Sequence, residues 1–229
     1  MIMADKQTSL ICENLSFAGK EAYKRLRTNV LFSFADEKPS HVIGVTSSGP
    51  TDGKSVTAVN LAFSLYELGK KVLLIDADMR RPSVQDKLEI RQNPGLSDLL
   101  VNTNDISACI VHSRQNEAAL MDVIPAGVLP PNPAELLNSP RMGRLLRKVA
   151  EAYDFVIIDL PPVGAVTDAQ AVSGLTDGMI VVVRAGVCEK RMLDECLAQL
   201  NLAKAKILGF VLNGSLEGAG KNYGGKYYK

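Results

Sequence analysis

The chain has 229 residues, 46% hydrophobic and 22% charged, which is enough to bury the core of one globular domain. Its 26 basic and 25 acidic side chains give a net charge of +1, which excludes a general attraction to nucleic acid. No window approaches the roughly 20 apolar residues that cross a bilayer, and the four cysteines form no C-x-x-C pair. We therefore expect a soluble cytoplasmic protein with no nucleic-acid partner.

The first predicted element is an amphipathic helix over residues 19–34, in which Tyr23, Leu26, Val30 and Phe34 recur at helical spacing. Short runs rich in valine and isoleucine then predict strands, with helical patterns between them. The strands cover residues 41–46, 72–76, 120–125, 155–159, 179–183 and 207–212, and the later helices cover residues 54–68, 139–153, 168–175 and 189–202. This alternation predicts an α/β fold with three α/β/α layers around a mostly parallel sheet.

Two segments interrupt the alternation. The proline-rich residues 127–140 predict a structured loop with one short helix around residues 134–137, and no domain boundary. From residue 214 onward the composition changes to glycine, lysine, asparagine and tyrosine, with no apolar run. Such a composition predicts a flexible tail.

The clearest motif is the loop Ser48-Gly49-Pro50-Thr51-Asp52-Gly53-Lys54-Ser55, which joins the first predicted strand to the next helix. Strand, loop and helix in this order aim backbone N–H groups and the positive end of a helix at a phosphate. Lys54 would supply a cation for the β- and γ-phosphates, and Ser55 a hydroxyl ligand for Mg²⁺. The loop departs from the usual pattern at Ser48, which replaces the first glycine, and at Asp52. The alternative interpretation is an ordinary turn and cap before a helix.

Aspartates follow two of the predicted strands. Asp76 and Asp78 come at the end of one strand, and Asp159 ends another. Ligands of an open α/β sheet bind at the carboxyl ends of its strands, and Mg²⁺ on a nucleotide needs one or two carboxylates nearby. Aspartate commonly begins a loop, but together with the phosphate loop these residues predict a magnesium–nucleotide site.

Four stretches carry a family resemblance. They are Glu-Ala-Tyr-Lys-Arg-Leu-Arg-Thr-Asn at residues 21–29, the loop at residues 46–55, Leu-Ile-Asp-Ala-Asp-Met-Arg-Arg-Pro at residues 74–82, and Val-Ile-Ile-Asp-Leu-Pro-Pro at residues 156–162. With them the chain resembles the deviant P-loop ATPases, and more closely the bacterial tyrosine kinases of capsule and exopolysaccharide synthesis. The resemblance spans nearly the whole chain. It implies a P-loop kinase domain over residues 1–213, with an N-terminal segment over residues 1–40, and a tail over residues 214–229.

The resemblance also implies roles for the residues of the site. Catalytic roles fall to Lys54, Asp76, Asp78 and Asp159, and Mg²⁺ ligation to Ser55, Asp76 and Asp159. ATP would be bound by Gly49, Pro50, Thr51, Asp52, Gly53, Lys54, Ser55, Val56 and, at the adenine, Asn213. Which aspartate is the base and which the metal ligand stays open, and Asn213 with Gly214 is also an ordinary turn pair.

The tail contains three of the six tyrosines of the chain, Tyr223, Tyr227 and Tyr228. The family typically ends in such a cluster and phosphorylates it between subunits, so the resemblance implies three phosphoacceptors. Partitioning ATPases of the same class carry a signature lysine where this chain has Gly49, which favours the kinases. The alternative interpretation of the tail is a solvated end with incidental aromatic residues.

Glu21, Lys24 and Arg27 resemble the Glu-x-x-Arg-x-x-Arg motif that the family uses for subunit contact in a ring, with Lys24 in place of the middle arginine. A solvated helix face is the alternative. The resemblance further implies two partners, a membrane-bound polysaccharide chain-length regulator that activates the chain at the inner face of the membrane, and a cognate tyrosine phosphatase.

The sequence thus predicts an ATP-dependent protein-tyrosine autokinase that regulates capsular or exopolysaccharide synthesis and export. The alternatives are a non-kinase ATPase switch of the partitioning or septum-site type, and a scaffold that binds nucleotide without turnover.

Overall fold

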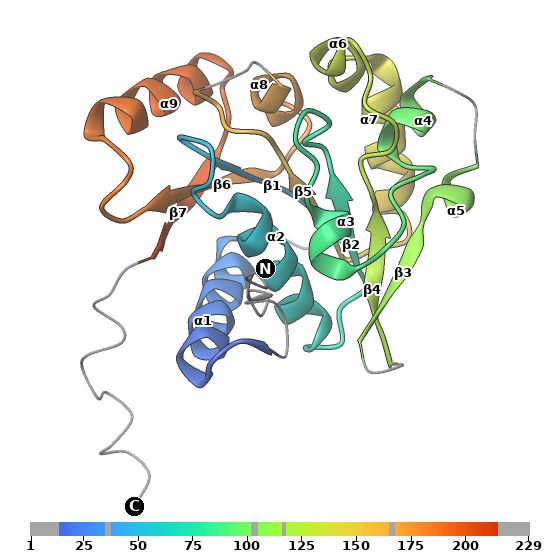
Figure 1. The fold of residues 1–229 in the computed structure, drawn as a ribbon, viewed down its shortest axis with the longest axis horizontal. Coiled ribbons are helices and arrows are strands. Elements are labelled where there is room, and N and C mark those ends of the chain that lie inside the picture. Colours follow the sequence, from blue (N-terminus) through green and yellow to red (C-terminus); the bar gives the residue numbers. More distant parts are fainter. Residues whose placement is uncertain (1–13, 35–37, 102–104, 116–117, 165–167, 215–229) are drawn as a thin grey trace, which may run out of the picture.

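The computed structural model describes residues 14–34, 38–101, 105–115, 118–164 and 168–214 (Figure 1). The strands are β1 (His41–Ser47), β2 (Val72–Asp76), β3 (Val111–Gln115), β4 (Ala118–Ile124), β5 (Phe155–Asp159), β6 (Gly178–Arg184) and β7 (Ile207–Asn213). The helices are α1 (Phe17–Ser33), α2 (Lys54–Tyr66), α3 (Val84–Leu88), α4 (Leu96–Val101), α5 (Ile106–Cys109), α6 (Pro133–Leu137), α7 (Pro140–Ala150), α8 (Asp168–Ser173) and α9 (Lys190–Leu202).

The strands form one seven-stranded sheet in the order β3-β4-β2-β5-β1-β6-β7. Each neighbouring pair is parallel except β3 and β4, which are antiparallel. Every residue of β1, β2 and β5 is buried. These strands are covered on both faces, which explains their unbroken apolar runs and confirms the predicted mostly parallel sheet.

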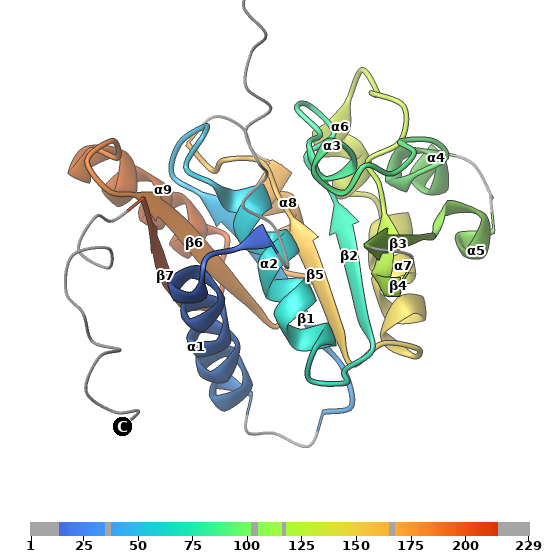
Figure 2. The same cartoon turned by 60° about the horizontal axis from the view of Figure 1, so that its bottom comes forward.

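Helices cover both faces of the sheet and give the domain three layers (Figure 2). On one face, Ile43 of β1 packs in a cluster with Val30 of α1 and Leu61 of α2. On the other face, Val42 of the same strand joins a cluster that includes Leu200 of α9 and side chains of α4 to α8. Neighbouring residues of one strand therefore enter different cores, as the two-residue period of a strand requires.

Helix α1 packs as its sequence pattern predicts. Val30 is buried, and Leu26 and Phe34 pack against the same cluster as α2. At the start of the helix, the Ser16 side chain accepts a hydrogen bond from the Gly19 N–H and acts as an N-cap. Among the described residues, neither α1 nor any other helix is long and apolar enough to cross a membrane.

The structure adds elements that the sequence analysis omitted. Strand β3 was missed because its sequence, Val-His-Ser-Arg-Gln, is polar, which a strand at the edge of the sheet, next to β4, can accommodate. Helices α3, α4 and α5 have five, six and four residues, too few to show a helical period. The short helix expected around residues 134–137 is confirmed as α6.

The strand order explains where the site forms. Strand β5 lies between β1 and β2, and Asp159 pairs in register with Val45 on one side and with Asp76 on the other. The loop after β1 and the aspartates after β2 and β5 therefore emerge side by side at one edge of the sheet. This is the edge at which parallel α/β sheets bind their ligands.

Candidate nucleotide and phosphoryl-transfer site

The loop between β1 and α2 depends on a glycine at its end. Gly53, directly before α2, has a φ of 95°, a conformation that side chains other than glycine rarely adopt. A Cβ atom there would lie 2.0 Å from Nδ2 of Asn213. That amide donates a 2.8 Å hydrogen bond to the carbonyl of Asp52. The end of β7 thus braces the loop, and Gly53 leaves room for the brace.

The two departures from the usual loop pattern form a pair. Oδ2 of Asp52 accepts hydrogen bonds from the Ser48 hydroxyl at 3.0 Å and from the Gly49 N–H at 2.9 Å. Ser48 therefore supplies a side-chain bond that a glycine at this position could not. The carbonyl of Thr51 accepts a bond from Arg184 of β6 at 3.2 Å. The Asp52 carboxylate thus links residues within the loop, and side chains of β6 and β7 bind the loop carbonyls from the neighbouring strands.

Lys54 is the cationic centre of the site. Its Nζ lies 2.8 Å from Oδ2 of Asp78, 3.2 Å from Oδ1 of Asp159 and 3.1 Å from Oγ of Ser55. Burial lowers the pKa of Lys54, but the charges of Asp159 and Asp78 outweigh that effect and the pKa is raised. Lys54 thus stays protonated in a nearly solvent-free cluster.

Asp76 is fully buried and held by backbone donors. It accepts hydrogen bonds from the N–H groups of Asp78, Ser83 and Val84 at 3.1–3.2 Å. Burial, followed by the charge of Asp159, nevertheless raises the pKa of Asp76 to about 7. Burial also raises the pKa of Asp159. Three buried carboxylates thus surround one ammonium, and the excess negative charge is of the kind that a divalent cation neutralises.

The residues present fit Mg²⁺ as part of a nucleotide complex. The hydroxyl of Ser55 and the carboxylates of Asp76 and Asp159 are the hard oxygen ligands that Mg²⁺ prefers. Among the described residues, no group of three acidic, histidine or cysteine side chains forms a complete metal site. Phosphate oxygens and water would therefore have to complete the coordination shell.

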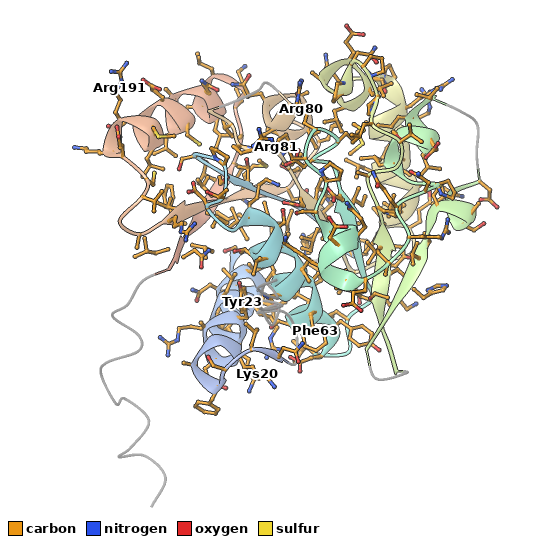
Figure 3. The ribbon with its side chains drawn as sticks, viewed as in Figure 1. Lys20, Tyr23, Phe63, Arg80, Arg81 and Arg191 are labelled. Atoms are coloured by element: carbon orange, nitrogen blue, oxygen red, sulfur yellow. The ribbon has the colours of Figure 1, made fainter. Side chains whose placement is uncertain are left out.

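A bidentate ion pair beside these carboxylates was missed by the sequence analysis. Arg80 and Arg81 lie on the loop between β2 and α3, near α8 (Figure 3). The guanidinium of Arg80 binds both carboxylate oxygens of Asp168, at 2.9 and 3.1 Å. Arg80 stands in one of the stretches that carried the resemblance, whereas Asp168 reads as an aspartate at the start of a helix, where it is common.

The remaining predicted residues lie elsewhere. Within the loop, Pro50 is exposed, and Val56 is half-buried on α2. On α1, Glu21 and Lys24 form a 2.8 Å ion pair with each other, while Arg27 donates a 2.6 Å hydrogen bond to the Ser64 carbonyl of α2. The predicted phosphoacceptors, Tyr223, Tyr227 and Tyr228, lie outside the described residues.

The sheet order, the braced loop and the Lys54 cluster together define a P-loop ATPase-type domain, and this fold binds nucleotide. A family model described as an AAA domain matches residues 40–208. The tyrosine-protein kinase YwqD of Bacillus subtilis (strain 168) is 38% identical over 208 residues, which cover 91% of this chain and 85% of YwqD. The putative tyrosine-protein kinase CapB of Staphylococcus aureus is 33% identical and is covered to 83%, with 84% of this chain.

A solved structure agrees with these relatives. The kinase domain of the Escherichia coli tyrosine kinase ETK superposes with a TM-score of 0.85 at 30% identity, covering 97% of this chain and 87% of that domain. The chain belongs to the bacterial tyrosine-protein kinases. Its activity is therefore ATP-dependent protein-tyrosine phosphorylation. The relatives confirm the enzyme class predicted from the sequence, and the superposition confirms the fold class.

Proposed function

We propose that this kinase phosphorylates Tyr223, Tyr227 and Tyr228 of its own tail, between subunits, and thereby regulates capsular or exopolysaccharide synthesis and export. One observation carries the proposal. Lys54 lies between the carboxylates of Asp78 and Asp159 beside the phosphate loop, in a chain whose last seven residues hold three tyrosines. The kinase domain would comprise residues 1–213 and the acceptor tail residues 214–229.

The proposed reaction follows from the charges of the site. Lys54 exchanges its carboxylate partners for the β- and γ-phosphates of ATP and neutralises charge that develops between them. Mg²⁺, when held by Ser55 with Asp76 or Asp159, supplies further charge neutralisation at the phosphates. The tyrosine oxygen attacks the γ-phosphorus, the bond to the β-phosphate oxygen breaks, and ADP leaves.

The proton of the tyrosine hydroxyl passes to a carboxylate. We assign this role to Asp76 or Asp78. Asp76 has a pKa raised to about 7, near the operating pH that suits a general base. Asn213, which holds the carbonyl of Asp52, would reach the adenine from the other side of the loop.

The proposal includes partners. A membrane-bound polysaccharide chain-length regulator would activate the chain and recruit it to the inner face of the membrane, and a cognate tyrosine phosphatase would reverse the modification. A homo-oligomer, arranged as a ring, would bring tails to neighbouring sites through Glu21, Lys24 and Arg27. Glu21 and Lys24 lie exposed on α1, which supports such a contact.

Purified protein incubated with Mg-ATP, with and without the cytoplasmic tail of the regulator, tests the proposal by mass-spectrometric mapping of phosphate. We expect phosphotyrosine on the tail, its loss in a Tyr223/Tyr227/Tyr228→Phe variant, and a rate about 10²–10³-fold lower in Lys54→Met. Lys148→Met, at an exposed lysine of α7, is the matched control and should keep the full rate. ATP hydrolysis without phosphotyrosine would favour the ATPase switch instead. Equal rates with and without the regulator would exclude activation in trans.

A further inference from the structure

We propose that Arg80 and Asp168 are a positioning pair, which fixes the loop carrying Asp76 and Asp78 for phosphoryl transfer but contributes little to ATP binding. This inference rests on the proposed catalytic roles of Asp76, Asp78 and Asp159. Arg80 and Asp168 act through those residues and not on the phosphates themselves.

The pair has the geometry of a specific clamp. Asp168 is fully buried at the start of α8. Nε of Arg80 donates to Oδ2 of Asp168 at 2.9 Å, and Nη2 donates to Oδ1 at 3.1 Å. Such a two-pronged bond fixes the orientation of both groups. Because a buried carboxylate needs a cationic partner, Arg80 is held at this point on α8.

Arg80 is tied to the site through a short, highly bonded loop. Two residues before it, Asp78 contacts Lys54 at 2.8 Å through Oδ2 and accepts the Arg81 N–H at 3.0 Å through Oδ1. Asp76 accepts the N–H groups of Ser83 and Val84 from the far end of the loop. The loop is therefore stiff, and a shift at Arg80 would be passed to both carboxylates.

The clamp also bridges the two segments that enclose Lys54. Asp78 follows β2, whereas Asp159 ends β5, and the chain runs from β5 to α8 and Asp168. The contact between Arg80 and Asp168 thus joins the β2 segment to the β5 segment outside the central cluster. It helps to set the separation of the carboxylates that face Lys54.

The phosphate loop is held in place by a different set of contacts. It is held by Asn213 and by the Asp52 carboxylate, and within the described part of the chain no hydrogen bond or ion pair joins either of them to Arg80 or Asp168. Loss of the clamp should therefore reduce the rate at saturating ATP and leave the ATP dependence nearly unchanged. Displacements of about 1 Å in a reacting group lower rates by up to about 100-fold.

The main test uses two variants. Asp168→Asn keeps the side-chain volume and removes the buried charge. Arg80→Lys keeps the positive charge and removes the guanidinium that makes the bidentate bond. A third variant, Arg80→Gln with Asp168→Asn, leaves no unpaired charge and serves if a single change impairs folding. Initial rates of phosphotyrosine formation are measured against ATP concentration with the regulator tail present. Binding of a fluorescent ATP analogue and thermal unfolding are measured in parallel.

We expect each folded variant to lose about tenfold or more in rate at saturating ATP, with half-saturation by ATP changed less than about twofold. The double variant should lose no more than Asp168→Asn alone, because Asp168→Asn already breaks the contact that Arg80→Gln would remove. Arg191→Gln, which breaks the exposed pair of Arg191 with Glu195 on α9, is the matched control and should keep the full rate. In Figure 3, Arg191 lies at the outer left of the molecule on α9, apart from Arg80 near the upper centre.

Unchanged rates in folded Asp168→Asn and Arg80→Lys would overturn the inference. A loss of ATP affinity as large as the loss of rate would overturn it as well. Lys54→Met separates this failure from failure of the proposed function. If Lys54→Met is inactive while the clamp variants are fully active, only the positioning role is wrong. If the unchanged chain hydrolyses ATP without forming phosphotyrosine, the proposed function fails. The role of the clamp is then decided by comparing the ATP hydrolysis rates of the clamp variants and the unchanged chain.

Discussion

Single residues of this site are arranged at the expense of stability. Asp76 and Asp159 are completely buried and Asp78 nearly so, yet among the described residues only Lys54 offers them a buried positive charge. Unbalanced buried charges oppose folding. In the proposed function the same excess of negative charge attracts the Mg²⁺ of a nucleotide complex, so binding and folding would make opposite demands on these carboxylates.

Asp76→Asn should therefore stabilise the ligand-free protein at neutral and alkaline pH while lowering its activity. The folded chain raises the pKa of Asp76 to about 7, against about 3.9 for an unfolded aspartate. The folded state binds this proton more tightly, so the contribution of Asp76 to stability is fully present below about pH 4. It is lost as pH rises through about 7.

Urea unfolding at pH 5 and pH 8, with EDTA and without nucleotide, measures this effect. We expect the free energy of unfolding to fall less between the two pH values in Asp76→Asn than in the unchanged chain, by about 1–3 kcal/mol. Asp86→Asn, at an exposed aspartate of α3, is the control. An identical pH dependence in Asp76→Asn and the unchanged chain would mean that Asp76 is already ionised at pH 5.

The sequence predicted the residues of this cluster whose spacing is local. Lys54 and Ser55 are fixed by the start of α2, and the three aspartates by the ends of β2 and β5. It did not predict the contact between Arg80 and Asp168, because those residues are 88 positions apart and meet only when β5 lies beside β2. Nor could a motif show that Ser48 and Asp52, each unusual alone, bond to one another.

At the scale of elements, the phosphate loop depends on the end of β7. Gly53→Ala would place a Cβ atom 2.0 Å from Nδ2 of Asn213 and force a side chain into a left-handed conformation. The conformational strain alone is worth about 1–2 kcal/mol. We expect Gly53→Ala to weaken binding of a fluorescent ATP analogue by tenfold or more.

Asn213→Ala separates the steric clash with Asn213 from the backbone strain at residue 53. It removes the bond to the Asp52 carbonyl but also the atom that a Cβ at residue 53 would meet. The Gly53→Ala and Asn213→Ala double variant should therefore lose less affinity than the sum of the single losses. Gly69→Ala is the matched control, since Gly69 has a φ of 81° with no atom near the added Cβ. It should lower the unfolding temperature and leave ATP affinity unchanged. Strict additivity would show that Asn213 is not what Gly53 must avoid.

Elements were predictable where burial imposes a pattern. Central strands such as β1 and β5 are buried along their whole length and read as apolar runs. The polar sequence of β3 lies at the edge of the sheet and, in the part of the chain that the structure describes, pairs with β4 alone, so neither composition nor period identifies it. The antiparallel hairpin it forms with β4 follows from the pairing of strands, which a single sequence does not display.

At the scale of the whole molecule, the length of the tail decides which phosphoryl-transfer sites its tyrosines can reach. The tail begins directly after Asn213, and Asn213 contacts the phosphate loop of its own chain. Tyr223 lies nine residue steps after Gly214, an extended span of about 30 Å. Reach alone therefore allows both the chain's own site and a neighbour's, and only the order of the reaction distinguishes them.

A mixture of two variants, each unable to phosphorylate its own tail for a different reason, tests transfer between subunits. Lys54→Met keeps the tail tyrosines but not the lysine proposed for phosphoryl transfer, and the Tyr223/Tyr227/Tyr228→Phe variant keeps that lysine but not the proposed acceptors. We expect the mixture, with Mg-ATP and the regulator tail, to place phosphate on the Lys54→Met chain, although neither variant alone forms tail phosphotyrosine. Because the step joins two chains, tenfold dilution should lower the rate per chain in the mixture.

The same mixture tests the contact through α1. Adding Lys24→Glu to both chains removes the pairing of Lys24 with Glu21 and places like charges one helical turn apart. If α1 forms the subunit contact, transfer in the mixture should fall several-fold, whereas Lys148→Glu on the exposed face of α7 should leave it unchanged. Two results together would contradict transfer between subunits: the unchanged chain, incubated alone, phosphorylates its tail, but the mixture places no phosphate on Lys54→Met. They would mean that each tail folds back onto its own site. In that case the rate per chain would not change on dilution, and α1 would be a solvated helix face.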